Sequence, residues 1–164
     1  MLKKTTILAI DPGLRELGYA VLHGPRLLAG GVRPLRLLPR ERRLGEAKRL
    51  VRGWIEAHRP SVLVLERTYH HPVPWLDEVH RLRLAVARLG RERDLVVASY
   101  APQTVRKALL GNGRASKREM AEAITHWFPA LRIYLTQDRK WKERHWRNLF
   151  DAVALALHHE KQNH

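Results

Sequence analysis

Short apolar runs alternate with longer amphipathic segments along this chain. Five of the runs have the length and residue types of β-strands. They cover residues 5–10, 18–23, 27–33, 61–66 and 94–100. The first and fourth runs are almost continuously apolar, which is typical of strands covered on both faces of a sheet. The Gly24-Pro25 turn joins the second run to the third, so these two are expected to be neighbours.

The longer segments carry apolar residues at the spacing of one helix face. The clearest helix covers residues 41–58 and ends before Pro60. Further helices are predicted over 76–90, 102–110 and 148–159, and within 111–128 after the capping box of Ser116 and Glu119. Three strands followed by alternating helices and strands predict a single α/β domain over residues 1–164. Its sheet is expected to be mixed, with five strands flanked by helices.

The composition excludes several kinds of protein. The chain has 164 residues, 45% of them hydrophobic, which suits one folded domain. It contains no cysteine, which excludes disulfides, thiolate metal sites and cysteine nucleophiles. There is no secretory signal pattern and no apolar run of membrane-spanning length. We therefore expect a cytoplasmic protein with no membrane partner.

The net charge is strongly positive. Lys and Arg number 31 against 16 Asp and Glu, which gives a formal charge of +15, and 23 of the 31 are Arg. A planar guanidinium can bind two phosphate oxygens, so this excess favours a nucleic-acid partner. The alternative is an Arg-rich surface that binds no nucleic acid.

Two acidic residues, Asp11 and Glu66, end apolar strands. If these strands are parallel neighbours, both carboxylates lie at the same edge of the sheet and can share a hard cation such as Mg²⁺. A third acid, Asp151, interrupts the apolar last helix, and Asn148 precedes it on the same face. In the alternative interpretation Asp11 caps a turn and Glu66 pairs with an Arg. Asn148 is then a helix N-cap, with Asp151 in the first turn.

Four segments in order resemble the RuvC family of Holliday junction resolvases. They read ILAIDPG with LGYAVL, LVLERTY, GNGRASK and NLFDAVALAL, and the resemblance covers roughly residues 6–159. It implies an RNase H-like fold and a homodimer that cuts four-way DNA junctions symmetrically. Each active site is then expected to hold two Mg²⁺ ions, with Mn²⁺ as a substitute. A branch-migration complex is a further possible partner.

The resemblance also implies roles for individual residues. Asp11, Glu66 and Asp151 match the family's catalytic metal ligands. The family usually carries Asp or His where this chain has Asn148, so Asn148 is expected to be a neutral fourth ligand. His145 or Asp138 is the alternative. Two-metal hydrolysis would leave a 5′-phosphate and a 3′-hydroxyl without a covalent intermediate.

Other matched positions are expected to bind DNA. Tyr69 matches a family aromatic that stacks on an unpaired base, with packing on the sheet rim as the alternative. Arg106 and Lys117 match phosphate-binding lysines, and Arg114 and Arg118 would extend that basic patch. The basic run 139–147 is expected to be a flexible arm that becomes ordered on DNA. The helix at 77–90 matches the family's dimer interface but is bulkier and more basic.

Two other functions compete with junction resolution. One is an RNA-processing nuclease of the same fold, similar to the YqgF family. The other is a non-catalytic nucleic-acid-binding module in which Asn148 marks a degraded site. Cleavage of four-way DNA, duplex DNA and structured RNA separates these three functions.

Overall fold

The computed structural model describes residues 4–135 and 140–163, and for 140–145 it describes the backbone only. Five strands form one mixed sheet in the order β3-β2-β1-β4-β5. The strands are β1 (Thr6–Asp11), β2 (Glu16–His23), β3 (Arg26–Pro34), β4 (Val62–Glu66) and β5 (Val96–Tyr100). The first three pair antiparallel, whereas β4 pairs parallel with β1 and β5. The predicted five-stranded mixed sheet is therefore confirmed.

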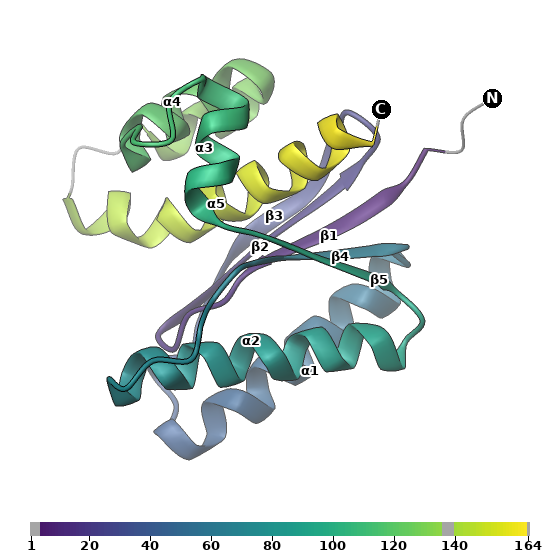
Figure 1. The fold of residues 1–164 in the computed structure, drawn as a ribbon, viewed down its shortest axis with the longest axis vertical. Helices are drawn as coiled ribbons and strands as arrows, with labels where there is room; N and C mark the ends of the chain where they lie inside the picture. The colour runs from purple at the N-terminus through teal and green to yellow at the C-terminus, as the bar shows by residue number, and fades with distance from the viewer. Residues whose placement is uncertain (1–3, 136–139, 164) are drawn as a thin grey trace.

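Helices cover both faces of the sheet (Figure 1). They are α1 (Arg40–His58), α2 (Pro74–Glu92), α3 (Pro102–Leu110), α4 (Lys117–Trp127) and α5 (Lys140–Gln162), with a 3-10 helix, η1, at Pro129–Tyr134. Helices α1 and α2 lie against one face, and α5 lies against the other with α3 and α4 beside it (Figure 1). Within the described residues, no helix combines the length and apolar character needed to cross a membrane.

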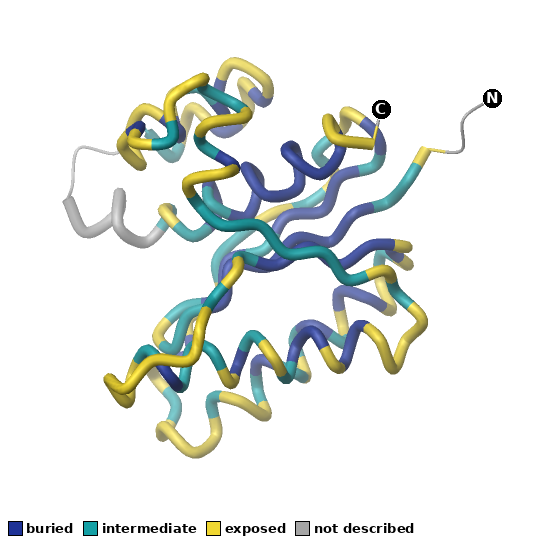
Figure 2. Tube along the Cα trace, in the orientation of Figure 1, coloured by how far each residue is buried: buried dark blue, intermediate teal, exposed yellow. Residues whose placement is uncertain are grey.

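The alternation of side chains along β1 divides the core in two. Ile7 and Ala9 pack in the cluster on the α5 side, and Leu8 and Ile10 pack in the cluster under α1 and α2. All four are at most 1% exposed. Figure 2 shows the central strands buried along most of their length. Burial on both faces is the reason that β1 reads as a continuous apolar run.

Helix α5 starts earlier than the sequence predicts. Its first residue is Lys140, so Asn148 and Asp151 lie in its interior and the N-cap interpretation of Asn148 is wrong. The flexible-arm prediction is also wrong for the backbone of 140–147, which is helical. No Pro or Gly interrupts this segment, and the Trp146 ring packs on Tyr134 of η1 with centroids 4.1 Å apart. The N-terminal half of α5 is therefore anchored to the domain.

Gly18 sets the position of α5 over the sheet. A Cβ atom built at Gly18 would lie 2.2 Å from the backbone oxygen of Asn148. The backbone of α5 thus rests directly on β2, a contact that any larger residue would prevent. Because Gly18 pairs with Asp11 across the β1–β2 ladder, this contact also brings α5 over the end of β1.

Candidate active site

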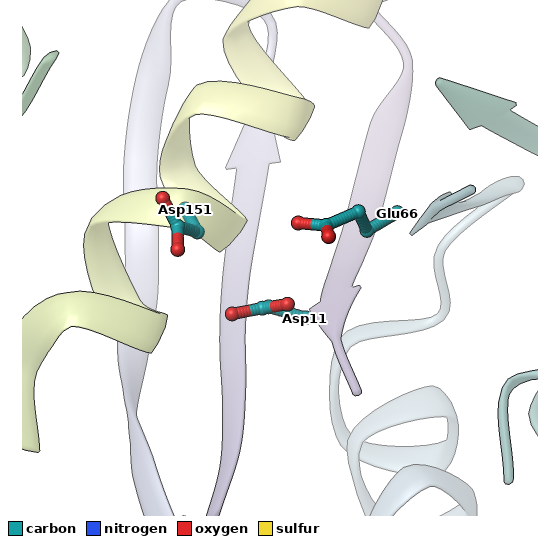
Figure 3. A group of neighbouring side chains, drawn as sticks. All are labelled: Asp11, Glu66 and Asp151. Atoms are coloured by element: carbon teal, nitrogen blue, oxygen red, sulfur yellow. The ribbon is translucent and has the colours of Figure 1, made fainter. Parts of the chain in front are cut away.

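Three carboxylates from distant parts of the chain converge at one edge of the sheet. Asp11 is the last residue of β1 and Glu66 the last residue of the parallel neighbour β4, where Ile10 pairs with Leu65. Asp151 reaches the same point from α5. One oxygen of each carboxylate lies within 4.8 Å of the others, and all three side chains point toward a common space (Figure 3). We call this group the carboxylate cluster.

Burial and mutual repulsion disfavour the charged forms of two of these acids. Asp11 is only 8% exposed. Its pKa is raised well above the ordinary value, first by desolvation and then by the charges of Asp151 and Glu66. Desolvation and the Asp151 charge raise the pKa of Glu66 to about 6. A cluster with this electrostatic cost suits a cation that neutralises it.

Lys117 is the cation that contacts the cluster among the described residues. Its Nζ donates to Oδ2 of Asp151 at 2.7 Å. Lys117 is the first residue of α4, which Ser116 and Glu119 cap as predicted. The charge of Lys117 lowers the pKa of both Asp11 and Glu66 and thus partly offsets their burial.

The donor set of the cluster fits a hard divalent cation. All three groups offer carboxylate oxygens, which Mg²⁺ and Mn²⁺ prefer over nitrogen or sulfur. Neither Asp11 nor Glu66 forms an ion pair or a side-chain hydrogen bond with any residue that the structure describes. The alternative in which Glu66 pairs with an Arg is therefore wrong, and both carboxylates are available as ligands.

Asn148 lies beside the cluster, one helical turn before Asp151. Its Nδ2 donates to the backbone oxygen of Glu16 at 3.4 Å. This bond turns the amide nitrogen toward the β1–β2 turn. Whether Asn148 is a metal ligand stays a prediction. The two alternatives lie outside the described structure, since Asp138 is not described and His145 is described in its backbone alone.

Three of the predicted DNA-binding cations lie around the cluster and one does not. Arg106 of α3 lines a small pocket with Glu66 and Asp151. Lys117 and Arg118 line another pocket beside Asp151. Arg114 is exposed in the α3–α4 loop, where it lines a separate hollow that contains no member of the carboxylate cluster.

Tyr69 lies in the exposed loop that follows Glu66. Its side chain is 67% exposed, so the alternative of packing on the sheet rim is wrong. The loop is held on α2 by two contacts, His70 Nδ1 with Asp77 Oδ1 at 2.7 Å and Thr68 Oγ1 with His80 Nδ1 at 2.9 Å. Tyr69 is thus presented to solvent from a loop that is anchored on both sides.

Two residues that share a pocket with Asn148 were not predicted from the sequence as site residues. Arg15 and Trp75 line an open pocket that also contains Asn148. They are 60 residues apart in the chain and match no motif, although a tryptophan after Pro72 and Pro74 in an exposed segment was an available clue.

An antiparallel β1–β2–β3 unit extended by parallel β4 and β5, with acids at two strand ends and on the last helix, defines an RNase H-like nuclease. The family model of "Crossover junction endodeoxyribonuclease RuvC" matches residues 7–159. The chain belongs to the RuvC family.

Individual relatives agree with this assignment. The crossover junction endodeoxyribonuclease RuvC of Corynebacterium jeikeium (strain K411) is 33% identical over an alignment 163 residues long. The alignment covers 93% of this chain and 91% of the relative. The Thermus thermophilus RuvC structure matches with a TM-score of 0.72 at 27% identity, over 94% of this chain and 92% of that one. A structure of T. thermophilus RuvC in complex with Holliday junction substrate matches with a TM-score of 0.73 at the same identity and coverage.

Proposed function

We propose that this chain is a metal-dependent endonuclease that resolves four-way DNA junctions by symmetric phosphodiester hydrolysis. The observation that carries the proposal is the convergence of Asp11, Glu66 and Asp151 on one space, beside the Lys117 ammonium. Membership of the RuvC family supports DNA junctions as the substrate. The relative from T. thermophilus has been solved with that substrate.

In this proposal Asp11, Glu66 and Asp151 hold two Mg²⁺ ions, or Mn²⁺ in their place, and Asn148 contributes a neutral oxygen. When bound, the ions supply Lewis-acid activation of water and stabilise the leaving 3′-oxygen. The products are then a 5′-phosphate and a 3′-hydroxyl.

The protein groups around the cluster position the DNA. Arg106, Lys117 and Arg118 bind phosphates near the scissile bond, and Arg114 extends the basic surface along the α3–α4 loop. The Lys117 ammonium moves from Asp151 to a phosphate oxygen when cations neutralise the carboxylates. Tyr69 stacks on an unpaired base at the branch point, which contributes about 1–3 kcal/mol per base. A homodimer that pairs through α2 would supply the second active site that symmetric cleavage requires.

The proposal is tested by cleavage of four-way DNA, duplex DNA and structured RNA with Mg²⁺, with Mn²⁺ and with EDTA. We expect metal-dependent cleavage of the four-way DNA alone. Preferential cleavage of structured RNA would favour a YqgF-like RNA-processing nuclease, and binding without cleavage would favour the non-catalytic module.

Substitution of the carboxylates should abolish cleavage and spare binding. We expect Asp11→Asn, Glu66→Gln and Asp151→Asn each to lower the cleavage rate by more than about 100-fold. Loss of a residue that only hydrogen-bonds a metal ligand already costs roughly 10–100-fold, and these substitutions change the ligands themselves. Junction binding should stay within about threefold of wild type, because phosphate contacts are untouched. Asp94→Asn, an exposed carboxylate in the α2–β5 turn, is the matched control and should cleave normally. Loss of binding in all three variants would contradict the assignment.

A further inference from the structure

The pocket that contains Arg15, Trp75 and Asn148 lies at the β1–β2 turn. It is an open pocket of about 520 Å³, within the range of roughly 300–1,000 Å³ typical of small-molecule sites. Its walls include Gly13, Arg15, Arg40, Trp75, Glu78 and Asn148, and we call it the Trp75 pocket. The β1–β2 turn and the start of α2 lie at the same end of the molecule (Figure 1).

The Trp75 pocket is close to the cluster but is built from other residues. Gly13 follows Asp11 by two residues, and Asn148 precedes Asp151 by one helical turn. Arg106 and Lys117 line other pockets. The pocket therefore lies on the Asn148 side of the carboxylate cluster.

The walls of the Trp75 pocket combine an aromatic face with two guanidinium groups. Among the described residues, Arg15 has no ion-pair partner and Arg40 pairs with Glu78. The Trp75 side chain is 57% exposed, unusual for the largest apolar residue. Arg15 is exposed and forms no side-chain hydrogen bond or ion pair with the residues described. The Arg40 Nε donates to Glu78 Oε1 at 2.6 Å, which neutralises Glu78 and leaves the other guanidinium N–H groups free to bind a ligand.

Arg43 lines the same pocket but has a structural role. Its guanidinium donates to the backbone oxygens of Leu38, Leu14 and Arg36 at 3.1, 3.4 and 3.5 Å. These bonds tie the β1–β2 turn to the segment before α1. The wall that carries Arg15 is therefore held in place before any ligand binds.

We propose that the Trp75 pocket binds a nucleotide adjacent to the cleaved phosphate. The base stacks on Trp75, and Arg15 and Arg40 bind its phosphate. Stacking on an indole requires an unpaired base, so the nucleotide belongs to the branch point and not to a paired arm. Arginine suits the phosphate because its planar fork binds two oxygens. This inference rests on the proposed function and adds a contact separate from Tyr69 and from Lys117.

Fluorescence of 2-aminopurine tests the proposal directly. The analogue is placed in turn at each nucleotide flanking the branch point of a four-way junction and in a single strand of the same sequence, with EDTA present. We expect quenching at one position on the wild-type chain, retained in Trp75→Phe and lost in Trp75→Ala. Junction affinity of Trp75→Ala should fall by about 5–150-fold, which corresponds to the loss of one stacked base.

The phosphate contact of Arg15 is tested by salt dependence. Arg15→Ala should lower the slope of log affinity against log salt by about 0.7–0.9, the contribution of one phosphate contact. Arg26→Ala removes the same charge at the opposite end of β2, where Arg26 is also exposed, and should leave both the slope and the quenching unchanged.

Three results would overturn the assignment of the pocket. The first is quenching that persists in Trp75→Ala. The second is an equal change of the salt slope in Arg26→Ala and Arg15→Ala. The third is a Trp75→Ala variant that sediments as a monomer when wild type sediments as a dimer, which would place Trp75 in a dimer interface. Quenching is measured without metal and cleavage with metal, so the pocket and the proposed function are tested by independent results. A chain that quenches through Trp75 but never cleaves with Mg²⁺ supports the pocket alone, and one that cleaves without Trp75-dependent quenching loses the pocket alone.

Discussion

At the scale of single residues, the carboxylate cluster is held in a state that costs stability. Asp11 is buried with no ion-pair partner among the described residues, and Glu66 has a pKa of about 6 against an ordinary value of 4.5. Between these two pH values the folded protein binds more protons at Glu66 than the unfolded chain does. The contribution of Glu66 to the free energy of unfolding therefore falls as pH rises through this window.

Glu66→Gln should remove this pH dependence. We compare the free energy of unfolding of the variant with that of wild type, both in EDTA. The variant-minus-wild-type difference should be more positive at pH 7 than at pH 4 by about 2 kcal/mol, the size of the Glu66 shift. Chemical denaturation at several pH values measures the difference. Asp11 contributes to it in the same direction, because the variant lacks the Glu66 charge that raises the pKa of Asp11. Saturating Mg²⁺ should narrow the gap, because only the wild-type carboxylate gains a ligand bond. A difference that is constant with pH would contradict the raised pKa.

The role of Asn148 as a metal ligand can be tested by substitution. Asn148→Asp should reach half-maximal cleavage at lower Mg²⁺, because an anionic oxygen binds a hard cation better than a neutral amide does. Asn148→Ala should need more Mg²⁺. The shift of the thermal midpoint with Mg²⁺ should follow the same order and gives a readout independent of activity. Equal Mg²⁺ midpoints in all three proteins would exclude Asn148 as a ligand and direct attention to His145.

At the scale of elements, the packing of α5 on β2 decides where Asp151 lies. The backbone of Asn148 approaches Gly18 too closely for a Cβ atom, and the same helix then places Asp151 over Asp11 and Glu66. The position of the third carboxylate thus depends on one glycine in a strand that carries no catalytic group.

Gly18→Ala should destabilise the fold and disturb the cluster. We expect a loss of about 1–3 kcal/mol or more in the free energy of unfolding, because α5 must shift to admit the methyl group. Gly53→Ala is the control, since nothing lies within 4 Å of a Cβ built there in α1. That substitution should stabilise by about 0.5–1 kcal/mol through helix propensity. Urea denaturation measures both changes. Equal changes in the free energy of unfolding for Gly18→Ala and Gly53→Ala would show that the close contact at Gly18 does not determine the position of α5.

At the scale of the whole molecule, the charge of +15 predicts salt-sensitive DNA binding. Arg106→Ala and Lys117→Ala should each lower the slope of log affinity against log salt by about 0.9 for duplex arms. Lys117→Ala should also raise the affinity for Mg²⁺, because the ammonium on Asp151 Oδ2 no longer competes with the ion. Fluorescence anisotropy from 50 to 200 mM salt measures the slope, with Arg26→Ala as the control. Slopes unchanged from wild type would remove both cations from the DNA interface.

Local patterns in the sequence were sufficient for much of the fold. They also marked all three carboxylates as candidates and placed two of them, Asp11 and Glu66, side by side. The apolar runs identified β1 and β4 because strands buried on both faces admit few polar residues. The capping box at Ser116 located the start of α4, since its hydrogen bonds span only three residues. Asp11 and Glu66 were predictable as neighbours once their strands were taken as parallel, because such strands end at the same edge.

Only the tertiary structure decided the remaining features, and each depends on contacts between distant residues. Nothing near Asn148 in the chain shows that α5 begins at Lys140, because that helix is anchored by Trp146 on Tyr134 and by Gly18 beneath it. The Lys117–Asp151 ion pair joins residues 34 positions apart. The Trp75 pocket gathers side chains from β1–β2, α1, α2 and α5. Periodicity records which face of an element is buried, but the packing of whole elements determines which side chains meet.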